Sequence, residues 1–250
     1  MKIMSLNVNQ FHVLRLSQGC WAKDIVAFVK KFLCEDINNA VFLYEVPYYA
    51  GTSGRFYNKL ELFEDFCEEF PDHSYMKNYS AEKAYFCTVA ITNTKSGWEA
   101  ADAVCRFGVK DEEGKDVFKN RFVECVYKDE GAEALRVLGV HASLKTPFLE
   151  TLTDYIKKVT EEKRCPKFMV LGDLNCHRRE SSSHRRYLNK MEQYLCDLIE
   201  DNTVTYFPGG TTVDHVLISQ GFKDSVTAQA IPKVVLELSD HAVIIVNIEK

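Results

Sequence analysis

Polar residues capable of chemistry follow directly after apolar runs at several points of this sequence, and this pattern constrains the fold most. Residues 172–175 (Gly-Asp-Leu-Asn) follow a mostly apolar run at 167–171, and residues 239–241 (Ser-Asp-His) lie between runs at 234–238 and 242–246. Runs of this length are typical of buried strands. In an α/β protein, ligands bind outside the ends of such strands. The sequence therefore predicts an α/β fold whose functional site lies where several strands end.

The chain as a whole combines many predicted strands with few predicted helices. Pro147 suits the start of a helix, because the first helical position needs no backbone N–H donor. Helices are expected at 21–33, 58–70, 146–159 and 183–199. Strands are expected at 2–8, 40–45, 85–92, 103–109, 118–128, 135–142, 167–172, 204–207, 213–219, 234–238 and 242–248. This balance predicts two packed sheets with helices outside.

Length and composition favour a single domain over residues 1–250. The chain has 250 residues, of which 46% are hydrophobic, so it can bury a large core. Only 6 prolines and 12 glycines occur, and no segment has the composition of a linker. No run of about 18 apolar residues is present, so membrane insertion is not expected. The 9 cysteines form no CxxC motif, which favours reduced thiols and a cytoplasmic location. Oligomeric state is left open.

The charge distribution gives two opposing indications about nucleic acid. The formal net charge of −5 counts mildly against tight DNA binding by the whole chain. A local basic loop at 177–186 nevertheless follows the motif at 172–175 and carries Arg178, Arg179, Arg185 and Arg186. These arginines could clamp substrate phosphates through bidentate contacts, or the loop could be the solvated start of a helix. Both interpretations stay open.

The predicted strand ends supply a set of metal-ligating and proton-transferring side chains. In chain order these are Asn7 and Asn9, Glu45, His141, Asp173 and Asn175, Asp214 and His215, and Asp240 and His241. Carboxylate and amide oxygens suit Mg²⁺ or Mn²⁺, which keep waters that a phosphate can displace. Imidazoles can orient or deprotonate water, or protonate a leaving oxygen. The set therefore indicates metal-assisted phosphoryl transfer.

Six motifs in this order resemble the endonuclease/exonuclease/phosphatase superfamily, which has the DNase I-like fold. They are 6–9 (Leu-Asn-Val-Asn), 44–46 (Tyr-Glu-Val), 139–141 (Gly-Val-His), 172–175, 213–215 (Val-Asp-His) and 239–241. One such motif is weak, but six in family order are specific. The resemblance implies a four-layer α/β sandwich of two packed mixed β-sheets flanked by helices. It also implies divalent-metal-dependent cleavage of a phosphoester.

The same resemblance assigns the metal-binding and charge-carrying residues. It makes Glu45 the principal metal carboxylate, with Asn7 and Asp240 in the same metal site. Asp214 would orient His241, which would act either as a general base or as a phosphate-binding imidazolium. Sequence leaves that choice open.

Further roles follow by resemblance for residues around this centre. Asp173 and Asn175 would hold the nucleophilic water and the phosphate. His141 matches a histidine of DNase I-like and sphingomyelinase-like members, which points away from abasic-site repair. Arg121 resembles a substrate-facing arginine, and Glu82 is the candidate carboxylate to pair with His141.

Two positions depart from the family pattern or have a structural interpretation. Asn9 stands where many abasic-site members carry an acidic metal ligand, so a second metal is less expected. His215 is interpreted as a structural histidine, because an aromatic residue commonly fills this place in relatives.

Three functions remain to be compared. The favoured one is a Mg²⁺- or Mn²⁺-dependent phosphodiesterase, a nuclease acting on DNA. The second is a phosphatase or phosphodiesterase for a small or lipid-linked phosphate, of the phosphoinositide or sphingomyelin type, which the acidic net charge favours. The third is a noncatalytic binding module, which the retained site residues argue against.

Overall fold

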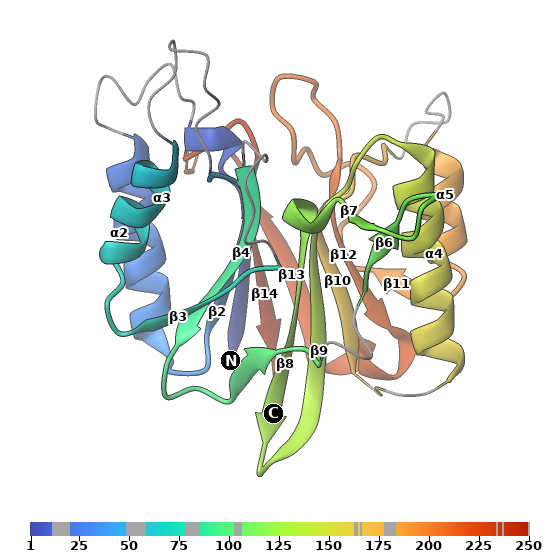
Figure 1. Cartoon of the computed structure of the whole chain (residues 1–250), viewed down its shortest axis with the longest axis horizontal. Coiled ribbons are helices and arrows are strands. Elements are labelled where there is room, and N and C mark those ends of the chain that lie inside the picture. Colours follow the sequence, from blue (N-terminus) through green and yellow to red (C-terminus); the bar gives the residue numbers. More distant parts are fainter. Residues whose placement is uncertain are drawn as a thin grey trace.

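Two facing β-sheets with helices on their outer sides make up the computed structural model (Figure 1). The structure describes residues 1–11, 21–48, 59–78, 86–102, 107–162, 165, 167–177, 184–233, 235–236 and 238–249. Helices α2 (Trp21–Glu35) and α3 (Lys59–Glu68) cover one sheet, and α4 (Thr146–Glu161) and α5 (Arg185–Met191) cover the other. The predicted four-layer α/β arrangement is therefore confirmed.

The first sheet has six strands in the order β13-β14-β1-β2-β4-β3. Their bounds are β13 (Val226–Ile231), β14 (Val243–Ile248), β1 (Lys2–Asn7), β2 (Ala40–Pro47), β4 (Phe86–Asn93) and β3 (His73–Met76). The central pair β1 and β2 is parallel, and the other neighbours are antiparallel. The sheet is therefore mixed.

The second sheet repeats this plan in the order β11-β12-β10-β9-β8-β5. Its strands are β11 (Leu195–Asp197), β12 (Asp214–Ser219), β10 (Phe168–Asp173), β9 (Ala132–His141), β8 (Phe122–Asp129) and β5 (Trp98–Ala100). Again one central pair, β9 and β10, is parallel. A small hairpin of β6 (Val109–Lys110) and β7 (Asp116–Val117) and the 3-10 helices η1 (Asn9–Phe11), η2 (Lys119–Arg121) and η3 (Gln220–Ser225) complete the described elements.

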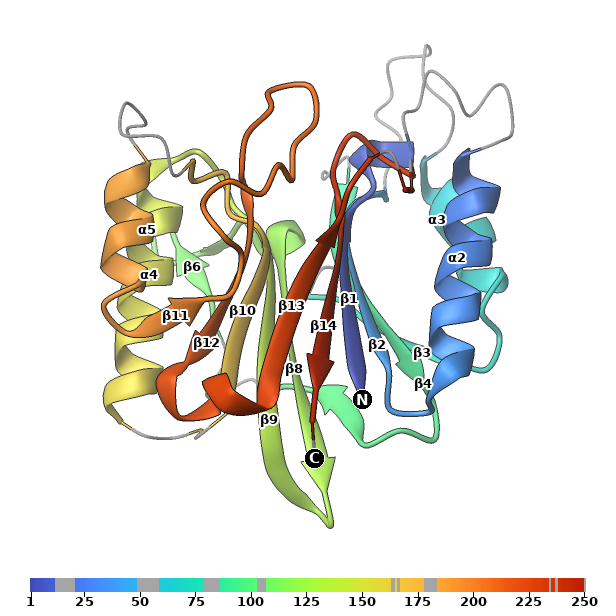
Figure 2. The same cartoon turned by 180° about the vertical axis from the view of Figure 1, so that it is seen from behind.

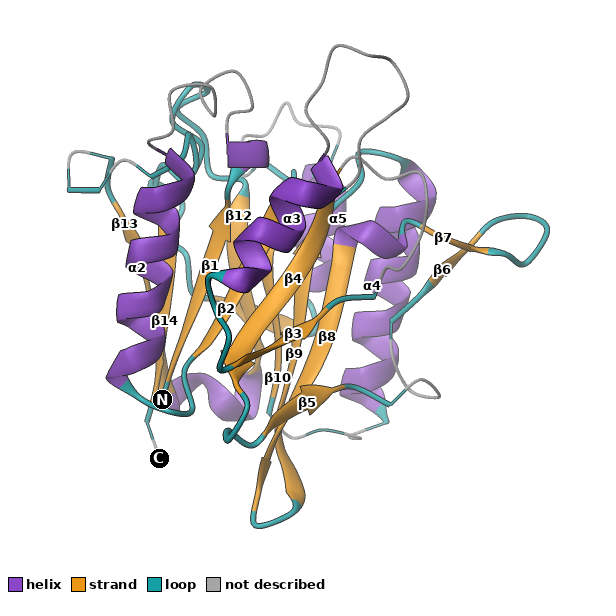
Figure 3. Ribbon diagram, turned by 60° about the vertical axis from the view of Figure 1, so that its left-hand side comes forward, coloured by secondary structure: helices purple, strands orange, loops and turns teal. Residues whose placement is uncertain are grey.

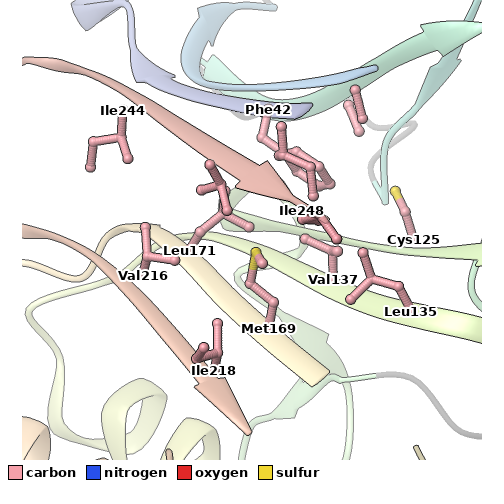
Figure 4. Packing of buried hydrophobic residues seen from close by; sticks show 14 of the residues in the cluster. Phe42, Cys125, Leu135, Val137, Met169, Leu171, Val216, Ile218, Ile244 and Ile248 are labelled. Atoms are coloured by element: carbon pink, nitrogen blue, oxygen red, sulfur yellow. The ribbon is translucent and has the colours of Figure 1, made fainter. Parts of the chain in front are cut away.

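Three apolar layers hold the sandwich together. Between the sheets, side chains such as Phe42, Leu171 and Ile244 pack against one another (Figure 4). The outer faces are covered by helices whose apolar residues recur at helical spacing, such as Leu152 and Ile156 on α4, both fully buried. Each buried side chain of this size stabilises the fold by about 1.5–3 kcal/mol. In the described part of the chain, no helix has the length and apolar content needed to cross a membrane.

Three sequence-based element predictions were wrong in the C-terminal third. The helix expected at 183–199 ends at Met191, because residues 195–197 pair with β12 as an edge strand. The apolar run at 234–238 is not a strand in its described residues, whereas β13, at 226–231, pairs with β14 over six residues. Residues 204–207 form only isolated bridges through Tyr206. In each case the pairing partner, rather than local hydrophobicity, decides the conformation.

Gly172 permits the close approach of the two sheets just before the site. Its φ is +127°, and a Cβ there would lie 2.2 Å from the Val140 carbonyl oxygen and 2.6 Å from the Tyr44 ring. Only glycine fits both restrictions. Because Gly172 has no side chain, the Tyr44 ring fits beside it, and the Tyr44 hydroxyl donates a hydrogen bond to the Leu171 carbonyl at 3.0 Å. The next residue along the chain is Asp173.

Candidate active site

The candidate site lies at one edge of the sandwich, where strands of both sheets end. The parallel pairs β1/β2 and β9/β10 bring their carboxyl ends to this edge. The loop that precedes β14 lies beside η1 at the same edge (Figure 2). The site residues carried there are Asn7, Glu45, His141, Asp173, Asp214, Asp240 and His241.

His241 and Asp214 form a buried hydrogen-bonded pair. Nδ1 of His241 lies 2.9 Å from Oδ2 of Asp214, and Nε2 lies 3.9 Å from Oδ2 of Asp173. Burial alone would lower the pKa of His241, but the neighbouring carboxylates, Asp214 above all, outweigh burial and raise it to about 10. The imidazole is therefore protonated at neutral pH and can donate hydrogen bonds from both ring nitrogens. The Tyr206 ring packs against it at 5.0 Å between centroids.

Asp173 lies at the centre of the cluster, buried between groups from both sheets. Burial and then the charge of Asp214 raise its pKa to about 7, against the opposing effects of His241 and Asn7. The Asn7 amide donates to Oδ2 of Asp173 at 3.1 Å and to Oε1 of Glu45 at 3.2 Å. This amide therefore connects a carboxylate of each sheet.

His141 is a neutral imidazole, in contrast to the protonated His241. Its Nε2 lies 3.4 Å from Oε1 of Glu45 and 3.8 Å from Oδ2 of Asp173. Burial, reinforced by the charges of Arg121 and His241, lowers the pKa of His141 well below its usual value. Within the described residues, its buried Nδ1 has no hydrogen-bond partner. The site thus combines a neutral imidazole and an imidazolium.

Two site residues have left-handed backbone conformations. Glu45 has φ +55° where the pairing of β2 with β4 shifts register, and this bulge re-aims its side chain. Asn175 has φ +51°, donates from its backbone to Oδ1 of Asp173 at 3.0 Å and from its amide to the Ala142 carbonyl at 3.0 Å. Each such conformation costs about 1–3 kcal/mol in a residue other than glycine, and such costs concentrate at functional sites.

Acidic side chains from both sheets gather at this edge, beside His241. One ligand atom from each of Asp173, Asp214 and His241 lies within 4.8 Å of the others, and all three residues are buried. Glu45 and Asp173 accept from the same Asn7 amide nitrogen, so carboxylate oxygens are available from both sheets. Oxygen-rich sets of this kind suit hard cations.

Asp240 reaches this cluster through asparagine and serine side chains. The Asn9 amide donates to Oδ2 of Asp240 at 2.8 Å, and the Asn9 backbone N–H donates to Oδ1 of Asn7 at 2.9 Å. Asn9 therefore connects the Asp240 carboxylate to Asn7. The Ser239 hydroxyl lies 3.2 Å from Oδ1 of Asp240.

The arginines predicted to bind substrate lie in different parts of the structure. The structure brings Arg121, on η2, to the site, where its guanidinium lies 5.1 Å from the Phe86 ring and 3.4 Å from the Ala142 carbonyl oxygen. Arg185 and Arg186 lie in the first turn of α5, in an outer layer. Arg186 stacks on Tyr187 and donates to its hydroxyl at 2.9 Å. Arg178, Arg179 and Glu82 lie outside the described residues.

The sequence assigned no role to two residues that position the site, Ser239 and Thr205. The Ser239 hydroxyl donates to the Asn7 carbonyl at 2.6 Å and so joins the segment before β14 to β1. The Thr205 hydroxyl accepts from the backbone N–H groups of Val213 and Asp214, each at 2.9 Å. Ser239 is the first residue of the motif at 239–241, but no sequence signal identifies Thr205.

His215 has the structural role expected of it. Its ring is fully buried, with Nδ1 2.6 Å from Oδ2 of Asp197 and Nε2 2.9 Å from the Cys176 carbonyl oxygen. It therefore joins β12 to β11 and to the loop after β10, away from the catalytic candidates.

Comparison with solved structures confirms the DNase I-like fold. The endonuclease domain of TRAS1, a telomere-specific non-LTR retrotransposon, superimposes with a TM-score of 0.66 at 13% identity, over 99% of this chain and 97% of that chain. The AP endonuclease of Leishmania major gives 0.69 at 13%, over 100% and 87%. The 3'-5' exonuclease NExo of Neisseria meningitidis gives 0.62 at 18%, over 100% of each. A scan against protein-family models finds no match, and a search of curated proteins finds none either.

Proposed function

We propose that this chain is a Mg²⁺- or Mn²⁺-dependent phosphodiesterase that hydrolyses phosphodiester bonds in DNA. The observation that carries the proposal is the buried Asp214–His241 pair directed at Asp173, opposite Asn7 and Glu45. Structural neighbours named as an endonuclease domain, an AP endonuclease and a 3'-5' exonuclease support the same class of reaction.

The metal would be held by Glu45 and Asn7, with Asp240 completing the set. When bound there, Mg²⁺ or Mn²⁺ would neutralise charge on the phosphate and hold water near its reactive position. Asp173 lies one hydrogen bond from Asn7, so the metal ligands and the catalytic candidates form one continuous group.

His241 is the candidate for stabilising the phosphate during the reaction. Its raised pKa of about 10 supports the imidazolium role over the general-base role, because a base must be unprotonated at working pH. With Nδ1 bonded to Asp214, its Nε2–H can donate to a non-bridging phosphate oxygen. Its charge would then balance the negative charge that develops there.

Asp173 and Asn175 are the candidates for positioning the attacking water. The pKa of Asp173, about 7, suits a carboxylate that accepts a proton near neutral pH. Asn175 is fixed by two hydrogen bonds. Arg121 and the neutral His141 flank the cluster and can donate to phosphate or leaving-group oxygens.

Nicking of supercoiled plasmid tests this proposal. The wild-type protein should convert the plasmid to open circles in Mg²⁺ or Mn²⁺, and EDTA or His241→Ala should abolish the conversion. His73→Ala is the matched control, because the pairing of β3 with β4 places His73 opposite Asn93, at the other end of β4 from Phe86. That variant should keep wild-type activity.

The alternatives predict different results in the same experiment. No nicking by folded, metal-binding protein, together with hydrolysis of a soluble inositol phosphate or a sphingomyelin vesicle, would replace the nuclease proposal with the small- or lipid-phosphate alternative. No metal binding at millimolar Mg²⁺ or Mn²⁺ in calorimetry would support the noncatalytic module.

A further inference from the structure

A pocket of about 220 Å³ opens between the two sheets at the end of the sandwich opposite the candidate active site. Strands β1 and β10 end at the site with Asn7 and Asp173, whereas the pocket lies at their other ends, beside Met1 and Lys167. At about 3.3 Å per residue, the length of either strand separates the pocket from the site by roughly 20 Å. Figure 3 shows both marked chain ends and the turn between β8 and β9 at this end of the molecule.

The floor of the pocket is apolar and continues the core between the sheets. Leu135, Phe222 and Ile248 line it, and all three are buried members of the cluster that packs the sheets together. Tyr127 supplies an aromatic wall and packs against Trp98 at 5.4 Å between ring centroids. A ligand that fills this pocket therefore needs an apolar part.

The rim of the pocket carries more acidic than basic groups. The carboxylates that line it are Asp36, Asp129 and Glu249, and the lining side chain with a positive charge is Lys167. Asp36 is already engaged by the Met1 amino group at 3.7 Å. Among the described residues, Asp129 and Glu249 have no ion-pair partner. Two carboxylates are therefore available on the rim, against one lysine ammonium.

The electrostatics of the walls favour a cation. Burial, followed by the charges of Asp129 and Asp36, raises the pKa of the Tyr127 hydroxyl, so both carboxylates act on this wall. On the opposite aromatic group, the Lys167 ammonium lies 5.4 Å from the centroid of the Phe222 ring. The chain itself thus places a cation over one ring of the pocket, an arrangement that aromatic faces stabilise.

We propose that this pocket binds a small organic cation, in which an ammonium group is attached to an aromatic or aliphatic body. The body packs on Leu135, Ile248 and Tyr127, and the ammonium faces the carboxylates of Asp129 and Glu249. Pockets for drug-sized ligands start at about 300 Å³, so the ligand has the size of a single substituted ring. The site is separate from the candidate active site, and the inference does not depend on the proposed function.

A fluorine NMR titration with para-fluorobenzyl trimethylammonium tests the proposal on the whole chain. We expect this cation to bind more tightly than para-fluorobenzyl alcohol, and para-fluorophenylacetate to bind most weakly, because the three probes share a ring and differ in charge. Tetramethylammonium, which lacks the apolar body, should not displace the probe at equal concentration. The affinity should be the same with and without millimolar Mg²⁺, because the candidate metal ligands lie at the other end of the sandwich.

Charge variants locate the bound cation in the pocket. Asp129→Asn/Glu249→Gln should weaken binding of the cation by about 5-fold, since each exposed ion pair contributes little, and should leave the affinity for the alcohol unchanged. Lys167→Gln should strengthen binding, because it removes a like charge. The matched control is Glu112→Gln/Asp154→Asn, which removes two exposed carboxylates outside the pocket and should keep the wild-type Kd.

Several results would overturn the site. They are equal affinity of the wild-type protein for the cation and the alcohol, an unchanged Kd for the cation in the double carboxylate variant, and weaker binding by Lys167→Gln. Loss of binding on addition of Mg²⁺ would place the probe at the candidate active site instead and would equally contradict the proposal. No binding by the wild-type protein would also contradict it.

Discussion

At the scale of single residues, the two histidines of the site differ in charge because their surroundings differ. His241 has a carboxylate on one ring nitrogen and another within 4 Å of the second, so its charged form is favoured. His141 is also close to carboxylates, but burial and the neighbouring cations favour its neutral form. Histidine is the residue most easily tuned in this way near neutral pH.

Asp214→Asn should therefore change the pH dependence of cleavage as well as its rate. Without the carboxylate, the pKa of His241 falls from about 10. As pH rises, the variant therefore loses the active imidazolium at a lower pH than wild type does. We expect kcat to fall about 100-fold or more at pH 8, with a smaller loss at pH 6. A pH–rate profile measures this.

Asp197→Asn is the matched control for that profile. It removes the carboxylate partner of His215, the other buried Asp–His pair, which lies outside the site. Its profile should keep the wild-type shape even where stability falls. A parallel loss of activity at all pH values in Asp214→Asn would contradict the imidazolium role.

At the scale of elements, the ends of β2 and β10 are shaped by local backbone features. The bulge at Glu45 and the glycine before Asp173 place two carboxylates from different sheets on the two sides of the Asn7 amide. Regular strands would alternate side chains between faces and would not aim both carboxylates at one point. The geometry of the site is thus a property of strand irregularities.

Gly172→Ala should be strongly destabilising. The new Cβ would overlap the Val140 carbonyl, and alanine disfavours φ +127°. We expect the free energy of unfolding to fall by about 3 kcal/mol or more in urea denaturation. Gly221→Ala, where a Cβ meets nothing within 4 Å, is the control and should stay near wild type. Equal stability of the two variants would refute the close-approach argument.

At the scale of the whole molecule, metal binding and folding stability should be linked through pH. Asp173 has a folded pKa of about 7, above its ordinary value of 3.8, so the folded state holds the extra proton between these values. His241, raised from 6.5 to about 10, acts in the same direction. Metal-free protein should therefore lose stability as pH rises from about 6.5 to about 10, whereas below 6.5 the lowered pKa of His141 opposes the effect of Asp173.

Mg²⁺ should reverse part of this loss, because a cation replaces the proton among the carboxylates. The rise in Tm on adding Mg²⁺ should be larger at pH 8 than at pH 5.5, as measured by differential scanning fluorimetry. Asp173→Asn should reduce the pH dependence of metal-free stability. A Mg²⁺ effect independent of pH would contradict this linkage between the cation and the titration of Asp173.

Site residues could be predicted from the sequence where their residue type itself carries the chemistry. Elements and contacts could not be predicted where pairing between distant segments determines the conformation. Glu45, Asp173 and His241 were found because polar groups after apolar runs are unusual, and the structure brings all three together. β13 was missed because its strand identity depends on pairing with β14 rather than on its own hydrophobicity. Thr205 was missed because a hydroxyl that binds two backbone N–H groups has no sequence signature.

The most direct test of the central claim is the initial rate of plasmid nicking as a function of Mg²⁺ concentration, for wild type and Glu45→Gln. A carboxamide keeps the size of Glu45 but removes its charge, so metal affinity should fall while the fold persists. We predict saturating nicking by wild type and a requirement for at least about 10-fold more Mg²⁺ in the variant. Superimposable curves, or no nicking by wild type at any Mg²⁺ concentration, would contradict a metal-dependent nuclease centred on this site.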